Sequence, residues 1–81
     1  MKSYLYEGSL EPVMEVHVRR HPFRISVVPG ESGWYVVRCL DMPGCISQGK
    51  TRASAVRNIK DAILGFLESM EAHNEPLPWD K

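Results

Sequence analysis

Residues 34–49 read WYVVRCLDMPGCISQG, and this stretch decides the fold. Its first half, up to Leu40, is rich in aromatic and β-branched residues, which favour a strand. Residues 41–44 form a turn, because Pro presets φ and Gly tolerates a positive φ. Residues 45–48 predict a short returning strand that Gly49 closes. The stretch therefore predicts two antiparallel strands joined by a tight turn.

The residues before this stretch predict further strands of the same sheet. In residues 23–28, FRISVV, apolar and polar side chains alternate with period two, and PGESG at 29–33 follows as a turn. A weaker alternation in residues 13–20, VMEVHVRR, predicts another strand, which Pro22 is expected to end. Short turns between successive strands predict an antiparallel meander of three or four strands.

A long amphipathic helix follows the sheet. Between Thr51 and His73 the apolar residues recur at spacings of three and four, which is typical of a helix with one buried stripe. Thr51 is a suitable N-cap, while Asn74 and Pro76 mark the end. These limits predict about 20 helical residues that span about 30 Å. The apolar stripe consists of Ala55, Val56, Ile59, Ala62, Ile63, Phe66, Leu67 and Met70.

Together these elements predict an α+β domain with an antiparallel sheet of three to four strands followed by one long helix. A single helix covers only one face of such a sheet, and the strands carry apolar residues on both sides, for example at Val28 and Val37. A second copy of the chain is an economical cover for the other face. We therefore expect a homodimer or a tetramer.

Charge and composition disfavour several classes of function. Ten Lys and Arg residues balance ten Asp and Glu residues, so the formal net charge is zero. Domains that bind nucleic acids usually carry a basic excess, so DNA binding is not expected of this chain. No uncharged apolar stretch is long enough to cross a bilayer. The first residues lack a signal-peptide pattern, and the cytoplasm is the expected compartment.

The length of the chain allows one domain. Residues 13–81 are expected to form it. Residues 1–12, MKSYLYEGSLEP, show no sustained period, and we expect them to be a partly disordered N-terminal extension.

The motifs of residues 23–79 resemble a known family. The run GWYVV at 33–37, the run LDMPGCISQG at 40–49, and a capped amphipathic helix followed by NEPLP at 74–78 are similar in combination to the HicB-like antitoxins. The resemblance implies a β-β-β-α, partial RNase H-like fold and no enzyme activity. It also implies a protein partner, a HicA-type toxin that cleaves mRNA and that the antitoxin occludes, or else an orphan relative without a toxin.

The sequence departs from the family pattern in three places. It stops at Lys81, without the DNA-binding segment that many members carry after the helix. About 20 residues precede the first family strand. The helix begins TRASAV at 51–56, where Arg and Ser replace the usual acidic pair. We expect this replacement to weaken the capping box and to alter the partner surface.

No set of residues is arranged in sequence for catalysis. Cys45 is a nucleophile only beside a base that lowers its pKa, and no histidine is placed there by the sequence. A small buried thiol is the simpler interpretation, and a disulfide with Cys39 across the turn stays open. The scattered acidic residues disfavour a two-metal nuclease. We therefore expect no catalytic residues, no metal and no cofactor. The acidic residues in question are Glu31, Asp41, Asp61 and Glu68.

The residues expected to bind the protein partner are Arg38, Asp41, Met42 and Trp79. Asp41 is also expected to cap its own turn. Trp79 either packs back on the domain or anchors the partner, since Trp is enriched at interfaces. An alternative function is RNA binding through a basic cluster, which the neutral net charge disfavours. The candidate nucleic-acid residues are Arg19, Arg20 and Arg24.

Overall fold

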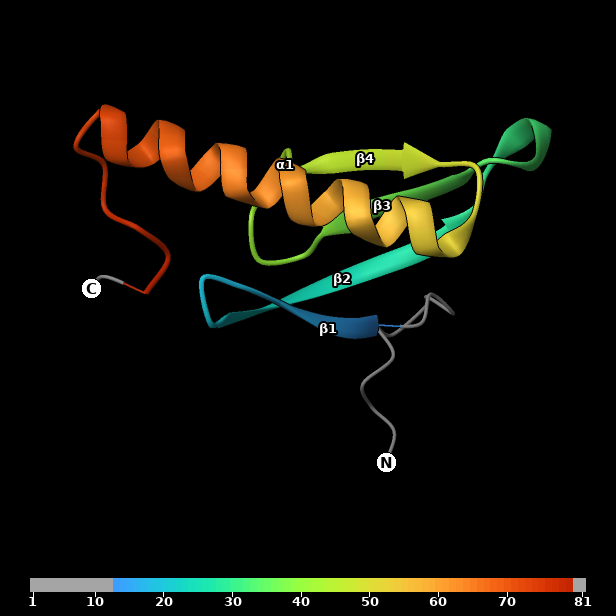
Figure 1. Cartoon of the computed structure of the whole chain (residues 1–81), viewed down its shortest axis with the longest axis horizontal. Helices are drawn as coiled ribbons and strands as arrows, with labels where there is room; N and C mark the ends of the chain where they lie inside the picture. The colour runs from blue at the N-terminus through green and yellow to red at the C-terminus, as the bar shows by residue number, and fades with distance from the viewer. Residues whose placement is uncertain (1–12, 80–81) are drawn as a thin grey trace.

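The structure is a computed structural model that describes residues 13–79. The expected disorder of residues 1–12 lies outside these residues. Figure 1 shows the elements in chain order. They are β1 (Val13–Val18), β2 (His21–Pro29), the 3-10 turn η1 (Glu31–Gly33), β3 (Tyr35–Cys39), β4 (Ile46–Gly49) and α1 (Arg52–Ala72).

The four strands form one antiparallel sheet in the order β1-β2-β3-β4. Each strand pairs with its neighbour in the chain, because every connection is short. The helix α1 lies across one face of this sheet (Figure 1), and no element among residues 13–79 covers the other face. This arrangement confirms the predicted α+β fold, and β1 is the fourth strand.

The core lies between α1 and the sheet. Phe23, Ile25 and Val27 alternate along β2 and point toward the helix, as the period of two predicts. The helix contributes side chains spaced at four residues, which lie on one stripe. The residues with no exposed surface are Phe23, Ile25, Val37, Cys45, Ala55, Ile59, Ile63 and Leu67.

The first hairpin differs from the prediction. Pro22 does not end a strand, because β2 already begins at His21 and the chain turns at Arg19 and Arg20. Both arginines have positive φ, 55° and 66°, as a two-residue hairpin turn of type I′ requires. Pro22 is tolerated because its pairing partner, His17, sits next to the pair that closes the turn. At that register the backbone nitrogen of Pro22 points away from β1, and the pairing with β3 does not extend as far as Pro22. The proline therefore removes no hydrogen bond from the sheet.

The connection from β4 to α1 is tight and well capped. Thr51 Oγ1 accepts a hydrogen bond of 3.0 Å from the Ser54 amide, and the Thr51 amide donates to Ser54 Oγ at 3.0 Å. The capping box is therefore intact, contrary to the expected weakening. The serine hydroxyl accepts the bond that an acidic side chain usually accepts at this position.

Candidate partner-binding surface

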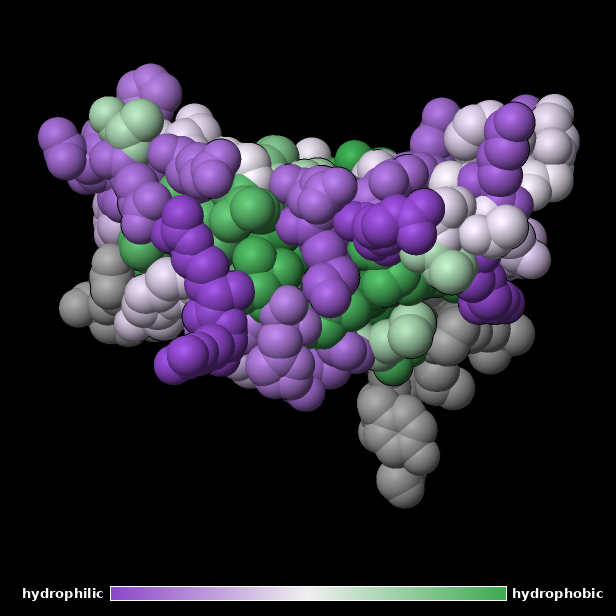
Figure 2. Space-filling view, viewed as in Figure 1, coloured by the Kyte–Doolittle hydropathy of each residue, from purple (hydrophilic) through white to green (hydrophobic). Residues whose placement is uncertain are grey.

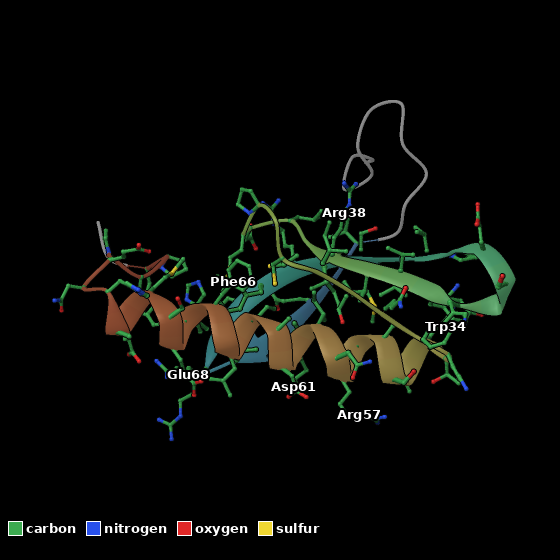
Figure 3. All side chains as sticks on the ribbon, turned by 90° about the horizontal axis from the view of Figure 1, so that it is seen from above. Trp34, Arg38, Arg57, Asp61, Phe66 and Glu68 are labelled. Atoms are coloured by element: carbon green, nitrogen blue, oxygen red, sulfur yellow. The ribbon has the colours of Figure 1, made fainter. Side chains whose placement is uncertain are left out.

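Arg38 stands in the middle of the outer face, by which we mean the face of the sheet that points away from α1. The register places Arg38 between Ser26 on β2 and Ile46 on β4. Figure 3 shows Arg38 and the helix on opposite sides of the sheet. Ile46 is 62% exposed, which is unusual for a large apolar side chain in a strand. A cation and an exposed apolar side chain thus lie next to each other on this face.

A shallow groove continues this surface onto the 41–44 turn. Arg38 and Ile46 line it together with Pro43 and Gly44. Gly44 has a φ of +87°, which the turn requires and which few other residues adopt. Met42, a predicted partner residue, lies below the turn and is only 3% exposed. It supports the groove from the core, so we do not include it in the surface.

Asp41 connects the turn to β2. Its Oδ2 accepts a hydrogen bond of 2.8 Å from the Arg24 amide. Its Oδ1 accepts bonds of 3.1 Å from Arg24 Nε and 2.7 Å from Arg24 Nη2. The carboxylate therefore does not cap its own turn as expected, but holds the turn against a strand that is distant in the sequence.

The pKa of Asp41 is lowered from its ordinary value of 3.8. Partial burial acts to raise this pKa, but the hydrogen bonds from the side chain and the amide of Arg24 outweigh that effect. Its folded form thus favours the carboxylate, so Asp41 contributes stability above pH 3.8, and this contribution disappears as the pH falls through the lowered value.

We expect Asp41→Asn to lower the free energy of unfolding by about 1 kcal/mol at pH 7, because Asp41 is partly exposed. The difference from the unsubstituted chain should shrink as the pH falls below 3.8 and through the lowered pKa of Asp41, since both chains then carry a neutral side chain. Urea unfolding followed by circular dichroism at pH 7 and over this acidic range measures the difference. A difference that stays constant with pH would contradict the ion pair.

The C-terminal tail folds back to the same end of the molecule. The Trp79 ring lies 4.7 Å from the His21 ring, and His21 in turn contacts Phe23 at 4.9 Å, both measured between ring centroids. Trp79 remains 37% exposed. It therefore packs on its own domain and still presents part of its ring to solvent.

The basic cluster predicted for RNA is largely engaged within the chain. Arg19 Nη1 donates to Glu71 Oε2 at 2.7 Å, and this bond raises the arginine pKa. Arg24 is bound to Asp41, as described above. Two of the three candidate nucleic-acid residues are therefore neutralised by carboxylates, while Arg20 is exposed at the turn.

The two cysteines face each other at the end of the β3–β4 pair. The Cys39 amide donates to the Cys45 carbonyl oxygen at 2.9 Å, and both thiols are free and buried. Burial raises the pKa of both thiols, that of Cys45 to about 11, with a further contribution from neighbouring Cys39. A raised pKa is the opposite of what a nucleophile needs.

Both thiols should therefore react slowly with iodoacetamide in the folded protein. A pKa of about 11 for Cys45 instead of 9.0 lowers its thiolate fraction about a hundredfold at neutral pH, and burial excludes the reagent as well. Mass spectrometry of samples labelled with and without urea measures the two rates. Equal rates in both samples would show that the thiols are accessible in the native state.

Metal-binding clusters and membrane-spanning helices are both absent from residues 13–79. No three His, Cys, Asp or Glu side chains in this range lie close enough together to hold a metal ion. The helix of this range is not long and apolar enough to span a membrane.

The geometry is that of a two-layer α+β domain with a helix on one face of its sheet and exposed Arg38 and Ile46 on the other. Residues 23–81 match the family model described as the HicB_like antitoxin of bacterial toxin-antitoxin systems. The chain belongs to this family, and family membership supports an antitoxin function in general. The matched range begins inside β2, so β1 lies before it.

Individual relatives agree with the family match. A UPF0150 protein of Thermoplasma acidophilum is 43% identical over 72% of this chain and 84% of its own length. Antitoxin HicB of Escherichia coli is 34% identical over 73% of this chain, which spans only 41% of that protein. A UPF0150 protein of Synechocystis is 41% identical over 57% of this chain and 58% of its own length. No solved structure matches the chain significantly.

Proposed function

We propose that this protein binds a HicA-type, mRNA-cleaving toxin in the cytoplasm and occludes it. The observation that carries the proposal is the outer face of the sheet, where Arg38 and Ile46 are exposed beside the groove at the 41–44 turn. Family membership supports the same class of partner.

The composition of this surface suits a protein partner. Interfaces are enriched in Arg and in apolar anchors that become fully buried on binding. Ile46 is such an anchor, and the half-buried Val28 and Val36 pair with each other on the same face. Arg38 supplies a donor fork that binds carboxylates or carbonyl oxygens. The strands are held in register by backbone hydrogen bonds, so little ordering is required on binding.

Occlusion needs no catalytic group. A rigid surface that covers the RNA-binding side of the toxin excludes the substrate by volume alone. Trp79 packs on His21, which shares the inward side of β2 with Phe23, so its partly exposed ring adds a contact at the end of the sheet and not on the outer face. We therefore propose Arg38, Ile46 and Trp79 as the contacts, with Asp41 as the residue that positions the turn.

Co-purification with the product of a neighbouring toxin gene tests this proposal. The unsubstituted chain should elute with the toxin as one complex and suppress its cleavage of RNA. Ile46→Asp should weaken the complex by roughly thirtyfold, because it places a charge in the centre of the contact. Arg38→Glu should weaken it as well.

Arg57→Glu is the matched control, since Arg57 is an exposed arginine on the side of α1 that points away from the sheet (Figure 3). It should leave toxin binding unchanged. If Arg20→Glu abolishes RNA binding by the isolated chain, and no complex with the toxin forms, the alternative RNA-binding function takes the place of this proposal. If Ile46→Asp binds the toxin as tightly as the unsubstituted chain, the outer face is not the contact.

A further inference from the structure

β4 forms one edge of the sheet, because β3 is the only strand among residues 13–79 that pairs with it. Figure 1 shows this edge on the upper side of the sheet. The Cys39 amide donates to the Cys45 carbonyl oxygen, and in an antiparallel pair such bonded positions alternate with unbonded ones. Ser47 therefore directs its N–H and C=O toward β3. Ile46 and Gln48 direct theirs away from the sheet.

One of the outward backbone groups has a partner on α1. Asn58 Nδ2 donates to the Gln48 carbonyl oxygen at 2.7 Å, which agrees with the outward direction of that carbonyl. The N–H and C=O of Ile46 and the N–H of Gln48 lie on the open part of the edge, where both residues are exposed. An edge of this kind is a template for pairing with a further strand.

One flank of α1 follows this edge. Its residues recur at spacings of three and four, and most of them are small. The bond from Asn58 to Gln48 places this flank next to β4. A side chain at Gly65 would meet no atom within 4 Å, so the space beside the helix is open there, although glycine is unfavourable inside a helix. The residues of the flank are Asn58, Ala62, Gly65 and Ser69.

The helix runs back along β4, so the positions along the edge can be matched. Gly49 at the end of β4 lies against Ala55, and Gln48 is bound to Asn58. Four helical residues advance by about 6 Å and two strand residues by about 7 Å. Ala62 therefore lies beside Ile46, and Phe66 lies one step further along the same channel.

The channel has an apolar side chain on each side. Ile46 is 62% exposed on the outer face, and the Phe66 ring is 38% exposed. Figure 3 shows Phe66 on the side of α1 that is nearer to the sheet. A groove beside Gly65, which Phe66, Ser69 and Met70 also line, continues the channel. In the view of Figure 2, hydrophobic surface reaches the margin of the molecule beside β4.

We propose that an extended, apolar segment of the toxin adds to the edge of β4 as a further strand, in the channel between this edge and the flank of α1. The inference rests on the proposed toxin binding and specifies how the toxin docks. An extended main chain has donors and acceptors at the spacing of the outward groups, whereas the main chain of a helix is bonded internally. Because the Gln48 carbonyl is already bound, the added ladder ends at Gln48.

The added strand would be apolar on both of its sides. Successive side chains of a strand point in opposite directions, so one set contacts Ile46 and the other contacts Ala62 and Phe66. Gly65 allows the backbone of this strand to approach the helix closely. Ile46 belongs both to this edge and to the outer face, so one toxin molecule can contact the two surfaces together.

Gln48→Pro in the full-length chain tests the added ladder. Proline is tolerated here, because the Gln48 N–H points out of the sheet and makes no bond to β3. It removes one donor from the edge, and its ring obstructs the incoming strand. The dissociation constant of the toxin complex, measured by calorimetry, should rise at least about tenfold. Gln48→Thr is the matched control, since it loses the same side chain but keeps the N–H, and it should stay within about threefold.

Hydrogen exchange of the unsubstituted chain measures the same ladder without a substitution. In the free chain the amides of Ile46 and Gln48 should exchange fast and that of Ser47 slowly, because only Ser47 donates within the sheet. Binding of the toxin should slow exchange at Ile46 and Gln48 by at least about tenfold. Exchange at Ser47 should change much less.

Gly65→Gln tests the helix side of the channel. It should raise the stability of the helix and yet weaken the toxin complex, which separates an interface effect from a folding defect. If the toxin binds but exchange at Ile46 and Gln48 is unchanged, and Gln48→Pro binds as tightly as Gln48→Thr, strand addition is wrong while toxin binding stands. If the unsubstituted chain forms no complex with the toxin, the proposed function fails and this inference fails with it.

Discussion

Gly49→Ala is expected to lower the free energy of unfolding by about 2 to 3 kcal/mol, which is a typical cost of overpacking. Gly49 is the last residue of β4 and is buried directly under the start of α1. A methyl group there would lie 2.5 Å from the Ala55 nitrogen and 2.8 Å from its Cα, and would also contact Ser54 Oγ. The backbone atoms cannot move aside without loss of the helix cap.

Gly65→Ala is the control from the same chain. It adds the same methyl group to a glycine that has no neighbour within 4 Å, and it should raise the stability by up to about 1 kcal/mol. Urea denaturation of the unsubstituted chain and of the two variants, at the same low protein concentration, measures both changes. Equal effects of the two substitutions would mean that α1 does not approach β4 as closely as described.

Phe23→Ala is expected to cost about 3 to 5 kcal/mol, because it opens a cavity in the centre of a thin core. The Phe23 side chain has no exposed surface and lies between the sheet and α1. Small domains have only about 5 to 15 kcal/mol of stability in total. We therefore expect this variant to be largely unfolded at 37 °C, and to lose partner binding for that reason.

Phe66→Ala provides the comparison for this substitution. It removes the same ring from a position that is 38% exposed, and it should cost less than about 1 kcal/mol. Thermal unfolding followed by circular dichroism distinguishes the two variants. If Phe66→Ala were as destabilising as Phe23→Ala, then the ring of Phe66 would belong to the core, and the groove beside Gly65 would not be a surface feature.

Much of the fold is predictable from local sequence patterns. The alternation in residues 23–28 predicts the inward residues of β2, and the spacing of apolar residues from 51 to 73 predicts α1 to within one residue at each end. The combination of the 41–44 turn with the strands beside it predicts the family. These features depend on residues that are close in sequence, so the pattern itself contains the information.

The candidate site was less predictable. Partner binding by Arg38 stays a prediction. Strand alternation accounts for its exposure, because Arg38 and the buried Val37 point to opposite faces of the sheet, whereas the burial of Met42 depends on how the turn folds over the core. The turn at Arg19 and Arg20 has no Gly or Asn that would indicate positive φ. No sequence pattern indicated that Ile46 belongs to the surface, because the exposure of one apolar residue in a strand depends on what covers that face of the sheet.

By itself the sequence determined the elements, their order and the stripe of α1 that is buried, because secondary structure and amphipathicity are periodic properties of neighbouring residues. Only the tertiary structure decided which charges meet. Asp41 binds Arg24 and Arg19 binds Glu71 across long separations in the chain, whereas Arg57 and Glu68 are left on an open surface. Ion pairs act over a few ångströms, so their partners are set by packing and not by spacing along the sequence.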